Sequence, residues 1–208
     1  FLRHPAYSPN LIRKAIGYGM KAHIGNVLQF LNYRLDVFLV NFFLGVTQVG
    51  FYTLALTVAE MLLYLPDAFA RVLFPKIASS GVEEARRFTP IVSRNVVFVT
   101  SILALVLFLV SRPLISVFYT NRFLPSVSAL WILLPGIVIL SLWRLLAFDL
   151  AGRGKPEVHS VASFVSLFAS ISFNIFLIPR WGIRGAAISS SLAYAIGAGV
   201  VVSFCLRI

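Results

Sequence analysis

Six long apolar runs constrain the fold of this chain more than any other feature of its sequence. A helix needs about 20 mainly apolar residues to cross the hydrocarbon core of a bilayer, and runs of this kind cover most of the 208 residues. With 59% hydrophobic and only 12% charged residues, one soluble core could not bury so many apolar side chains. The sequence therefore predicts an all-α, polytopic membrane protein whose six transmembrane helices form one bundle: residues 22–44, 49–69, 92–110, 127–148, 158–178 and 183–206.

The distribution of basic residues predicts the direction of the spans. Cationic residues gather on the cytoplasmic side of membrane helices. With the N-terminus inside, the inner segments hold most of the 18 Lys and Arg residues, and the outer loops hold Arg112, Arg122, Arg180 and Arg184. We therefore predict a protein of the cell inner membrane in which both ends of this chain are cytoplasmic. The net charge of +11 is then a topology signal, and we expect no nucleic-acid partner.

Residues 1–21 precede the first apolar run and are basic and amphipathic. We predict a cytoplasmic lead-in that lies at the lipid headgroups, with residues 22–208 forming the six-helix bundle. The chain starts at Phe1, and no basic segment with a small-residue cleavage site precedes the first run. We therefore expect no signal peptide and a chain that is part of a longer protein.

The first apolar run carries polar residues on two sides of its predicted helix. Gly25, Gln29, Asn32 and Asp36 recur at helical spacing, which places them in one stripe. Arg34 is two positions from Asp36 and therefore lies on another side. Because an ionisable residue inside a span is costly, it usually lines a polar cavity or pairs with another helix. We expect this helix to meet polar groups on both sides.

Two more polar residues lie inside later runs: Glu60 in the second and Asn174 in the fifth. The short turn at residues 45–50 makes spans one and two antiparallel neighbours. At about 1.5 Å per residue from this turn, Arg34 and Glu60 lie at the same depth, so they can form an ion pair. The candidate residues for a substrate-binding cavity are Asn32, Arg34, Asp36, Glu60 and Asn174.

Other features argue against metal sites and catalysis. Cys205 is the single cysteine, and the three histidines lack metal-ligand spacing, so we predict no disulfide and no metal site. The segment 152–156 lacks the spacing of a phosphate-binding loop. The inner loop between spans two and three offers few carboxylates for a membrane-embedded enzyme of envelope synthesis. We therefore expect no catalytic residues and no enzyme.

Small residues and one proline indicate how the later spans pack. Ala162, Ser166 and Ser170 recur every four positions in the fifth run, and Gly185, Ser189, Ala193 and Gly197 do so in the sixth. Such ladders let membrane helices approach closely. In the fourth run, Pro135-Gly136 predicts a kink that serves either packing or a hinge.

Several short segments occur in an order that is typical of one transporter family. They are Leu31-Asn32-Tyr33-Arg34-Leu35-Asp36, Phe74-Pro75-Lys76-Ile77, Leu150-Ala151-Gly152-Arg153-Gly154-Lys155-Pro156 and Pro179-Arg180-Trp181-Gly182-Ile183-Arg184-Gly185-Ala186-Ala187. Together they resemble the second half of polysaccharide transporters, the O-antigen-type oligosaccharide flippases of the MOP superfamily, which also holds MATE exporters and lipid II flippases. The resemblance begins near Arg13. One departure is Thr120, which stands where such proteins often have Gly.

The resemblance implies a larger transporter with two six-helix bundles around a central cavity and alternating access. This chain would be the second bundle, and its partners would be the N-terminal half, membrane lipids and a lipid-linked oligosaccharide on a polyprenyl pyrophosphate. The transporter would serve cell-surface polysaccharide biosynthesis. Arg34 would then supply the counter-charge for the pyrophosphate, while Asn32, Asp36 and Asn174 would hydrogen-bond sugar hydroxyls.

Three alternatives remain open on the sequence. Arg34 and Glu60 could form a structural ion pair that touches no substrate. Asp36 or Glu60 could instead carry H+ or Na+ as coupling ion, as in a MATE-type multidrug exporter of organic cations. A lipid II flippase is a further alternative within the same superfamily. A net positive charge in the full cavity would favour lipid pyrophosphates as substrates, and a net negative charge would favour cationic drugs. This chain supplies Arg34 but also Asp36 and Glu60, so its residues alone do not decide the sign.

Overall fold

A computed structural model describes residues 9–79 and 82–206, and this part of the chain contains helices and no strands. The predicted all-α class is therefore confirmed. The elements in order are α1 (Pro9–Leu44), α2 (Val46–Glu60), η1 (Met61–Leu63), α3 (Tyr64–Ser79), α4 (Val82–Phe118), η2 (Asn121–Phe123), α5 (Ser126–Gly152), α6 (Glu157–Trp181) and α7 (Ile183–Cys205).

Six stretches of these helices are long and apolar enough to cross a membrane, as predicted. The second span joins α2 to α3 through the short 3-10 helix η1, so the helix is interrupted directly after Glu60. The helical stretches reach past several predicted run ends because polar and proline residues can occupy the terminal turns. The spans are His23–Leu44, Val46–Val72, Phe88–Phe118, Ser126–Gly152, Glu157–Trp181 and Ile183–Cys205.

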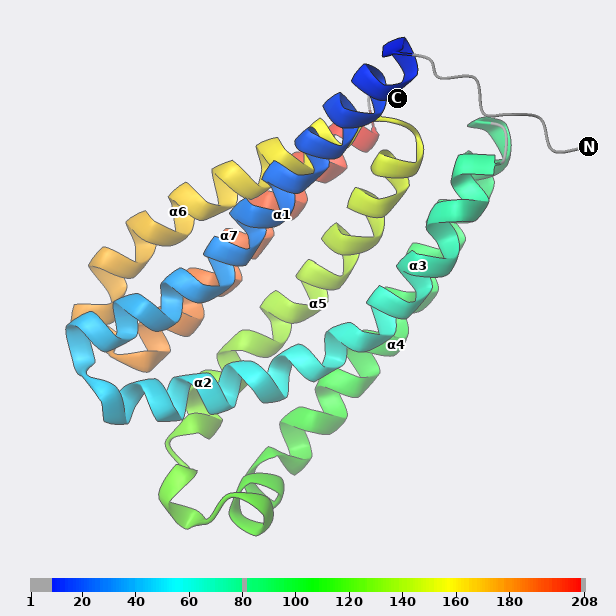
Figure 1. Ribbon diagram of the computed structural model, residues 1–208. Coiled ribbons are helices and arrows are strands. Elements are labelled where there is room, and N and C mark those ends of the chain that lie inside the picture. Colours follow the sequence, from blue (N-terminus) through cyan, green and yellow to red (C-terminus); the bar gives the residue numbers. More distant parts are fainter. Residues whose placement is uncertain (1–8, 80–81, 207–208) are drawn as a thin grey trace, which may run out of the picture.

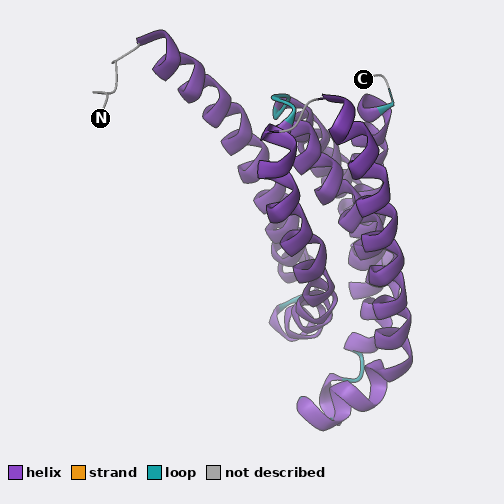
Figure 2. Ribbon diagram, turned by 90° about the vertical axis from the view of Figure 1, so that its right-hand side faces the viewer, coloured by secondary structure: helices purple, strands orange, loops and turns teal. Residues whose placement is uncertain are grey.

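The predicted lead-in is only partly described. Residues 1–8 lie outside the described residues, whereas residues 9–21 form the first turns of α1, in one helix with the first span. Figure 2 shows these turns running beyond the end of the bundle. Their position at the lipid headgroups stays a prediction.

The helix α5 occupies the middle of the bundle (Figure 1). It packs against α7 and α2 as well as against α3 and α4, while α6 packs against both α1 and α7. Successive spans reverse direction, so α1 and α6 run parallel to each other. One end of the bundle, called the Gly45 end here, carries the turns at Gly45 and Gly182 and the loop between α4 and α5.

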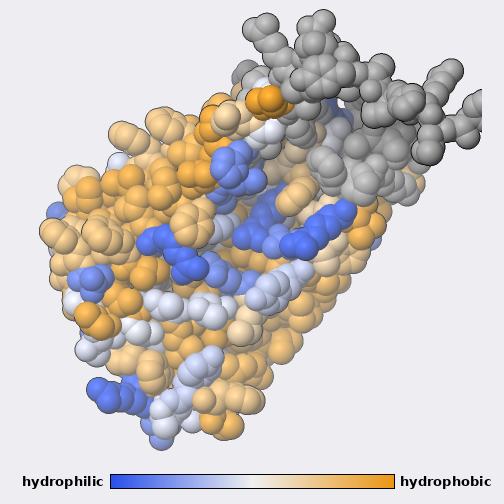
Figure 3. Space-filling view, viewed as in Figure 1, coloured by the Kyte–Doolittle hydropathy of each residue, from blue (hydrophilic) through white to orange (hydrophobic). Residues whose placement is uncertain are grey.

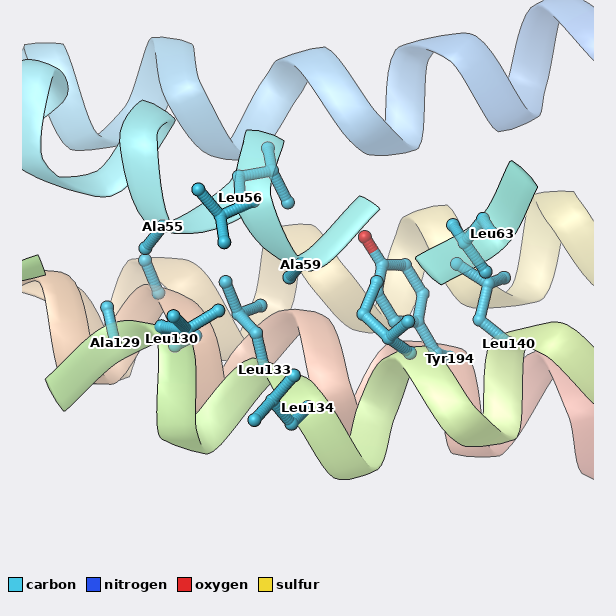
Figure 4. Packing of buried hydrophobic residues seen from close by; sticks show 14 of the residues in the cluster. Ala55, Leu56, Ala59, Leu63, Ala129, Leu130, Leu133, Leu134, Leu140 and Tyr194 are labelled. Atoms are coloured by element: carbon cyan, nitrogen blue, oxygen red, sulfur yellow. The ribbon is translucent and has the colours of Figure 1, made fainter. Parts of the chain in front are cut away.

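The apolar core lies between α2 and α5 (Figure 4). Ala55 and Ala59 of α2 are fully buried, as are Leu130 and Leu133 of α5. Alternating small and large side chains let two membrane helices approach closely. Tyr194 of α7 is buried beside them, and its hydroxyl points toward the α2 side.

Close contacts confirm tight packing at several of the small residues. A Cβ atom on Gly197 would lie 2.2 Å from the Trp143 ring, and one on Gly136 would lie 2.5 Å from the Ser191 hydroxyl oxygen. That hydroxyl donates to the Ile132 carbonyl at 2.9 Å, next to the helix turn in which Pro135 removes an N–H donor. Pro135-Gly136 therefore sits at a packing contact between α5 and α7.

Thr120 adopts a backbone conformation that favours glycine. Its φ is 89° and its ψ is 154°, just before η2. A side chain in this region of the backbone map is strained by about 1–3 kcal/mol. A glycine would adopt this backbone conformation without that strain, so Thr120 departs from the residue that the turn favours.

Candidate functional site

The predicted polar stripe of α1 faces α6. Gln29 accepts a hydrogen bond from Ser163 at 3.1 Å, and Asn32 donates to Ser166 at 2.8 Å. Each pair is separated by 134 residues. At the start of this row, a Cβ atom on Gly25 would lie 2.8 Å from the His159 ring, which shows how closely the two helices approach. Because α1 and α6 run parallel, polar residues with the same spacing on both helices meet at every step along them. This row of contacts between α1 and α6 is called the polar interface here.

The polar interface ends in a cluster around Asp36. The Asp36 carboxylate is fully buried and accepts hydrogen bonds from Ser170 at 2.9 Å and from the Asn174 amide at 2.8 Å. Ser190 of α7 also donates to it, and the Tyr52 hydroxyl lies at 3.4 Å. Donors from α2, α6 and α7 therefore surround this carboxylate, which satisfies the hydrogen-bonding needs of a buried charge.

A second polar region lies on the opposite side of α1, on a face of the bundle to which α1, α2, α3 and α5 all contribute residues. Figure 3 shows a band of hydrophilic side chains across this face, with apolar surface on either side. The charged and aromatic residues that define this charged face are Tyr33, Arg34, Glu60, Asp67 and Arg144.

Arg144 ties three helices together on the charged face. Its guanidinium forms an ion pair with Asp67 of α3 and donates to the Tyr33 hydroxyl of α1 at 3.1 Å. The guanidinium also lies 5.6 Å from the centre of the Tyr33 ring. The side chains of Arg144 and Asp67 are 25% and 29% exposed, so this pair remains open to ligand or water.

The predicted ion pair between Arg34 and Glu60 does not form. In the described part of the chain neither residue has an ion-pair partner, although the charges of Arg144 and Arg34 both act on Glu60. Arg34 is exposed, and its guanidinium lies 5.8 Å from the centre of the Phe30 ring. The prediction rested on an equal depth in the membrane, and depth fixes neither the rotation of two helices nor their lateral distance.

The structure thus divides the five predicted cavity residues into two groups. Asn32, Asp36 and Asn174 are fully buried in the polar interface, whereas Arg34 and Glu60 lie on the charged face. Whether any of them binds substrate stays a prediction.

Sequence reasoning missed Arg144 and Asp67, which are absent from the five candidate residues. Nearer the end of α5, Asp149 accepts a hydrogen bond from Thr89 at 2.7 Å and pairs with Arg153 at 2.9 Å. A signal was available in the sequence, because Arg144 and Asp67 both lie inside predicted runs, 127–148 and 49–69, where an ionisable residue is costly.

Comparison with known proteins decides the family. Residues 3–128 match the family described as "Polysaccharide biosynthesis protein". The chain belongs to this family. Family membership confirms the resemblance found in the sequence.

Relatives of the chain come from archaea and bacteria. The "Probable flippase AglR" of Haloferax volcanii is 27% identical over 176 residues, which cover 81% of this chain and 37% of the relative. The "Putative O-antigen transporter" of Shigella flexneri is 23% identical, covering 81% and 41%. The "Uncharacterized membrane protein MJ1068" of Methanocaldococcus jannaschii is 28% identical over 203 residues, covering 91% and 38%. The chain therefore spans about two fifths of the length of these relatives.

A solved structure shares the fold. It is an outward-facing multidrug resistance MATE family transporter of the MOP superfamily, with a TM-score of 0.65 and 17% identity. The match covers 92% of this chain and 44% of that transporter. The predicted MATE-like bundle is confirmed at the level of the fold.

Proposed function

We propose that this chain is the second bundle of a flippase that moves a lipid-linked oligosaccharide across the cytoplasmic membrane by alternating access. The substrate is a glycan on a polyprenyl pyrophosphate, and the process serves cell-surface polysaccharide biosynthesis. Support comes from the family and from relatives named flippase and O-antigen transporter. The protein acts as a transporter and not as an enzyme.

The observation that carries this proposal is the setting of Arg34. This guanidinium lies near the middle of a span, is exposed on the charged face, and has no ion-pair partner among the described residues. A cation in that position is costly unless a polar cavity or an anion meets it. A pyrophosphate would meet it through charge-assisted hydrogen bonds, which are stronger than neutral ones.

The charged face presents polar side chains that are at least partly exposed: Arg34 is exposed, and the side chains of Arg144 and Asp67 are 25% and 29% exposed. Arg144 is held in place by Asp67 and Tyr33, so it offers an oriented guanidinium on the same face as Arg34. Glu60 and Asp67 accept hydrogen bonds, as needed for sugar hydroxyls. We place the N-terminal half opposite this face, with the Gly45 end outside the cell and the N-terminus of the chain in the cytoplasm.

For a coupling ion we propose Asp36. The polar interface has no exposed side chain around this carboxylate, so it can take a proton or Na+ but no sugar. Its surroundings fit a hard cation, because Ser170, Ser190 and Tyr52 supply oxygen atoms. The side-chain oxygen of Asn174 is buried without a hydrogen-bond partner, so it is available as a further ligand.

A cation exporter is the second candidate, and Glu60 is the observation in its favour. This carboxylate lies on the charged face without an ion-pair partner in the described residues, and an organic cation would neutralise it. The fold of a multidrug MATE transporter is shared. The two candidates differ in which side chain is essential, Arg34 for a pyrophosphate and Glu60 for a cation.

The test is transport by the full-length protein in proteoliposomes, with a polyprenyl-pyrophosphate oligosaccharide in one assay and an organic cation in another. We expect oligosaccharide transport that Arg34→Ala abolishes, with Arg122→Ala as the matched control at the Gly45 end. Cation export that depends on Glu60, without oligosaccharide transport, would replace the proposal by the second candidate.

A further inference from the structure

The Gly45 end of the bundle carries cationic charge without acidic compensation. Residues 41–52, 112–128 and 178–190 build this end and contain no Asp or Glu. They contain four arginines: Arg112, Arg122, Arg180 and Arg184. Within the described residues neither Arg112 nor Arg184 has an ion-pair partner. Such a surface attracts anions.

Two of these arginines line a cavity. A cavity of about 420 Å³ lies between α4, α5 and α7, with Arg112 and Arg184 in its wall together with Trp131. A second cavity of about 560 Å³ shares Arg184 and Ser128 with the first and reaches Phe43 and Trp181. Their volumes fall in the range of small-molecule sites.

The first cavity is held in shape before any ligand binds. The Arg112 guanidinium stacks over the Trp131 ring, 5.4 Å from its centre. The indole nitrogen of Trp131 donates to the Ser111 hydroxyl at 2.8 Å, which fixes the ring under the arginine. Arg112 from α4 and Arg184 from α7 can therefore meet one anion together, and guanidinium groups suit phosphate oxygens.

We propose that these cavities bind the phosphate of an anionic lipid in the leaflet at the Gly45 end. The walls are partly apolar, through Leu124 and Val127 in the first cavity and Phe43 and Leu44 in the second, which favours a lipid over a free anion. Trp131 lies in the second turn of α5 and Trp181 is the last residue of α6, and aromatic side chains near span ends suit the membrane surface. The proposal uses none of the residues of the charged face.

Native mass spectrometry of the full-length protein tests the site. Detergent-solubilised protein is mixed with phosphatidylglycerol, phosphatidylcholine, polyprenyl phosphate or inorganic phosphate, and bound molecules are counted. A double variant with Arg112→Gln and Arg184→Gln, called the cavity pair, removes the cavity charges. A second double variant with Arg122→Gln and Arg180→Gln, called the control pair, removes the same charge at the same end, outside both cavities. Melting curves confirm that all variants fold.

We expect the protein to retain phosphatidylglycerol over phosphatidylcholine, and the cavity pair to weaken this binding at least about tenfold. The control pair should weaken it less than about twofold. Retention of polyprenyl phosphate alone, with the same dependence on the cavity pair, would support the site and identify its lipid as the transported carrier. Equal loss in both pairs, no loss in either, or equal competition by inorganic phosphate would overturn the proposal.

Discussion

The two sides of the helix α1 hold their charged residues in opposite environments. On one side Asp36 is fully buried and receives hydrogen bonds from three other helices. On the other side Arg34, two residues away, is exposed and without an ion-pair partner among the described residues. The two charged side chains of this helix therefore differ in exposure. This difference underlies the roles proposed for them, an atom-sized ligand for the polar interface and a large substrate for the charged face.

The largest effect is expected from removing the carboxylate of the polar interface. Asp36→Ala would leave buried donors from Ser170, Asn174 and Ser190 without an acceptor, at a cost of about 3 kcal/mol in folding free energy. Asp36→Asn keeps the shape and an acceptor oxygen, so it should cost less than half as much. Thermal unfolding in detergent measures both, and equal stability of the two variants would break the comparison.

A smaller loss is expected from widening the polar interface at Gly25. A Cβ atom there would lie 2.8 Å from the His159 ring and 2.9 Å from the Ser160 hydroxyl, so Gly25→Ala must push α1 from α6, costing about 1–2 kcal/mol. Gly19 is the matched control, since a Cβ atom there meets nothing within 4 Å. Gly19→Ala should instead stabilise the helix by about 0.5–1 kcal/mol. If the two substitutions shifted the melting temperature alike, the close contact would be disproved.

The ion pair of the charged face should contribute less than the buried cluster. A double-mutant cycle of Arg144→Ala and Asp67→Ala measures their coupling energy. Both side chains are about one quarter exposed, so solvent screening limits the coupling to about 1 kcal/mol. A coupling above about 3 kcal/mol would mean that the charged face is as closed as the polar interface.

The sequence singled out residues on both helices of the polar interface, among them Ser166, Ser170 and Asn174 on α6, but it did not predict that the two helices meet. The 4-3-4 spacing of Gly25, Gln29, Asn32 and Asp36 identified the stripe on α1, because periodicity is a property of one helix. The serines of α6 carry the same spacing, yet only the fold shows that α1 and α6 are neighbours with a constant offset of 134 residues.

The charged face was harder to predict for a physical reason. Counting residues from a turn gives depth in the membrane, and this placed Arg34 level with Glu60. Depth says nothing of rotation or lateral distance, and α2 ends at Glu60, where η1 begins. Arg144 was overlooked because basic residues near the end of a span were read as topology signals. Six spans and the fold class could be predicted because they depend on hydrophobicity alone.

The measurement that tests the account most directly compares Arg34→Ala with the wild type in two assays. The Arg34 guanidinium lies 5.8 Å from the centre of the Phe30 ring and has no ion pair in the described part of the chain. The substitution should therefore change the free energy of unfolding by less than about 0.5–1 kcal/mol. Transport of a polyprenyl-pyrophosphate oligosaccharide should nevertheless be lost. A variant that unfolds readily, or one that transports as well as the wild type, would contradict the assignment of Arg34 to the substrate.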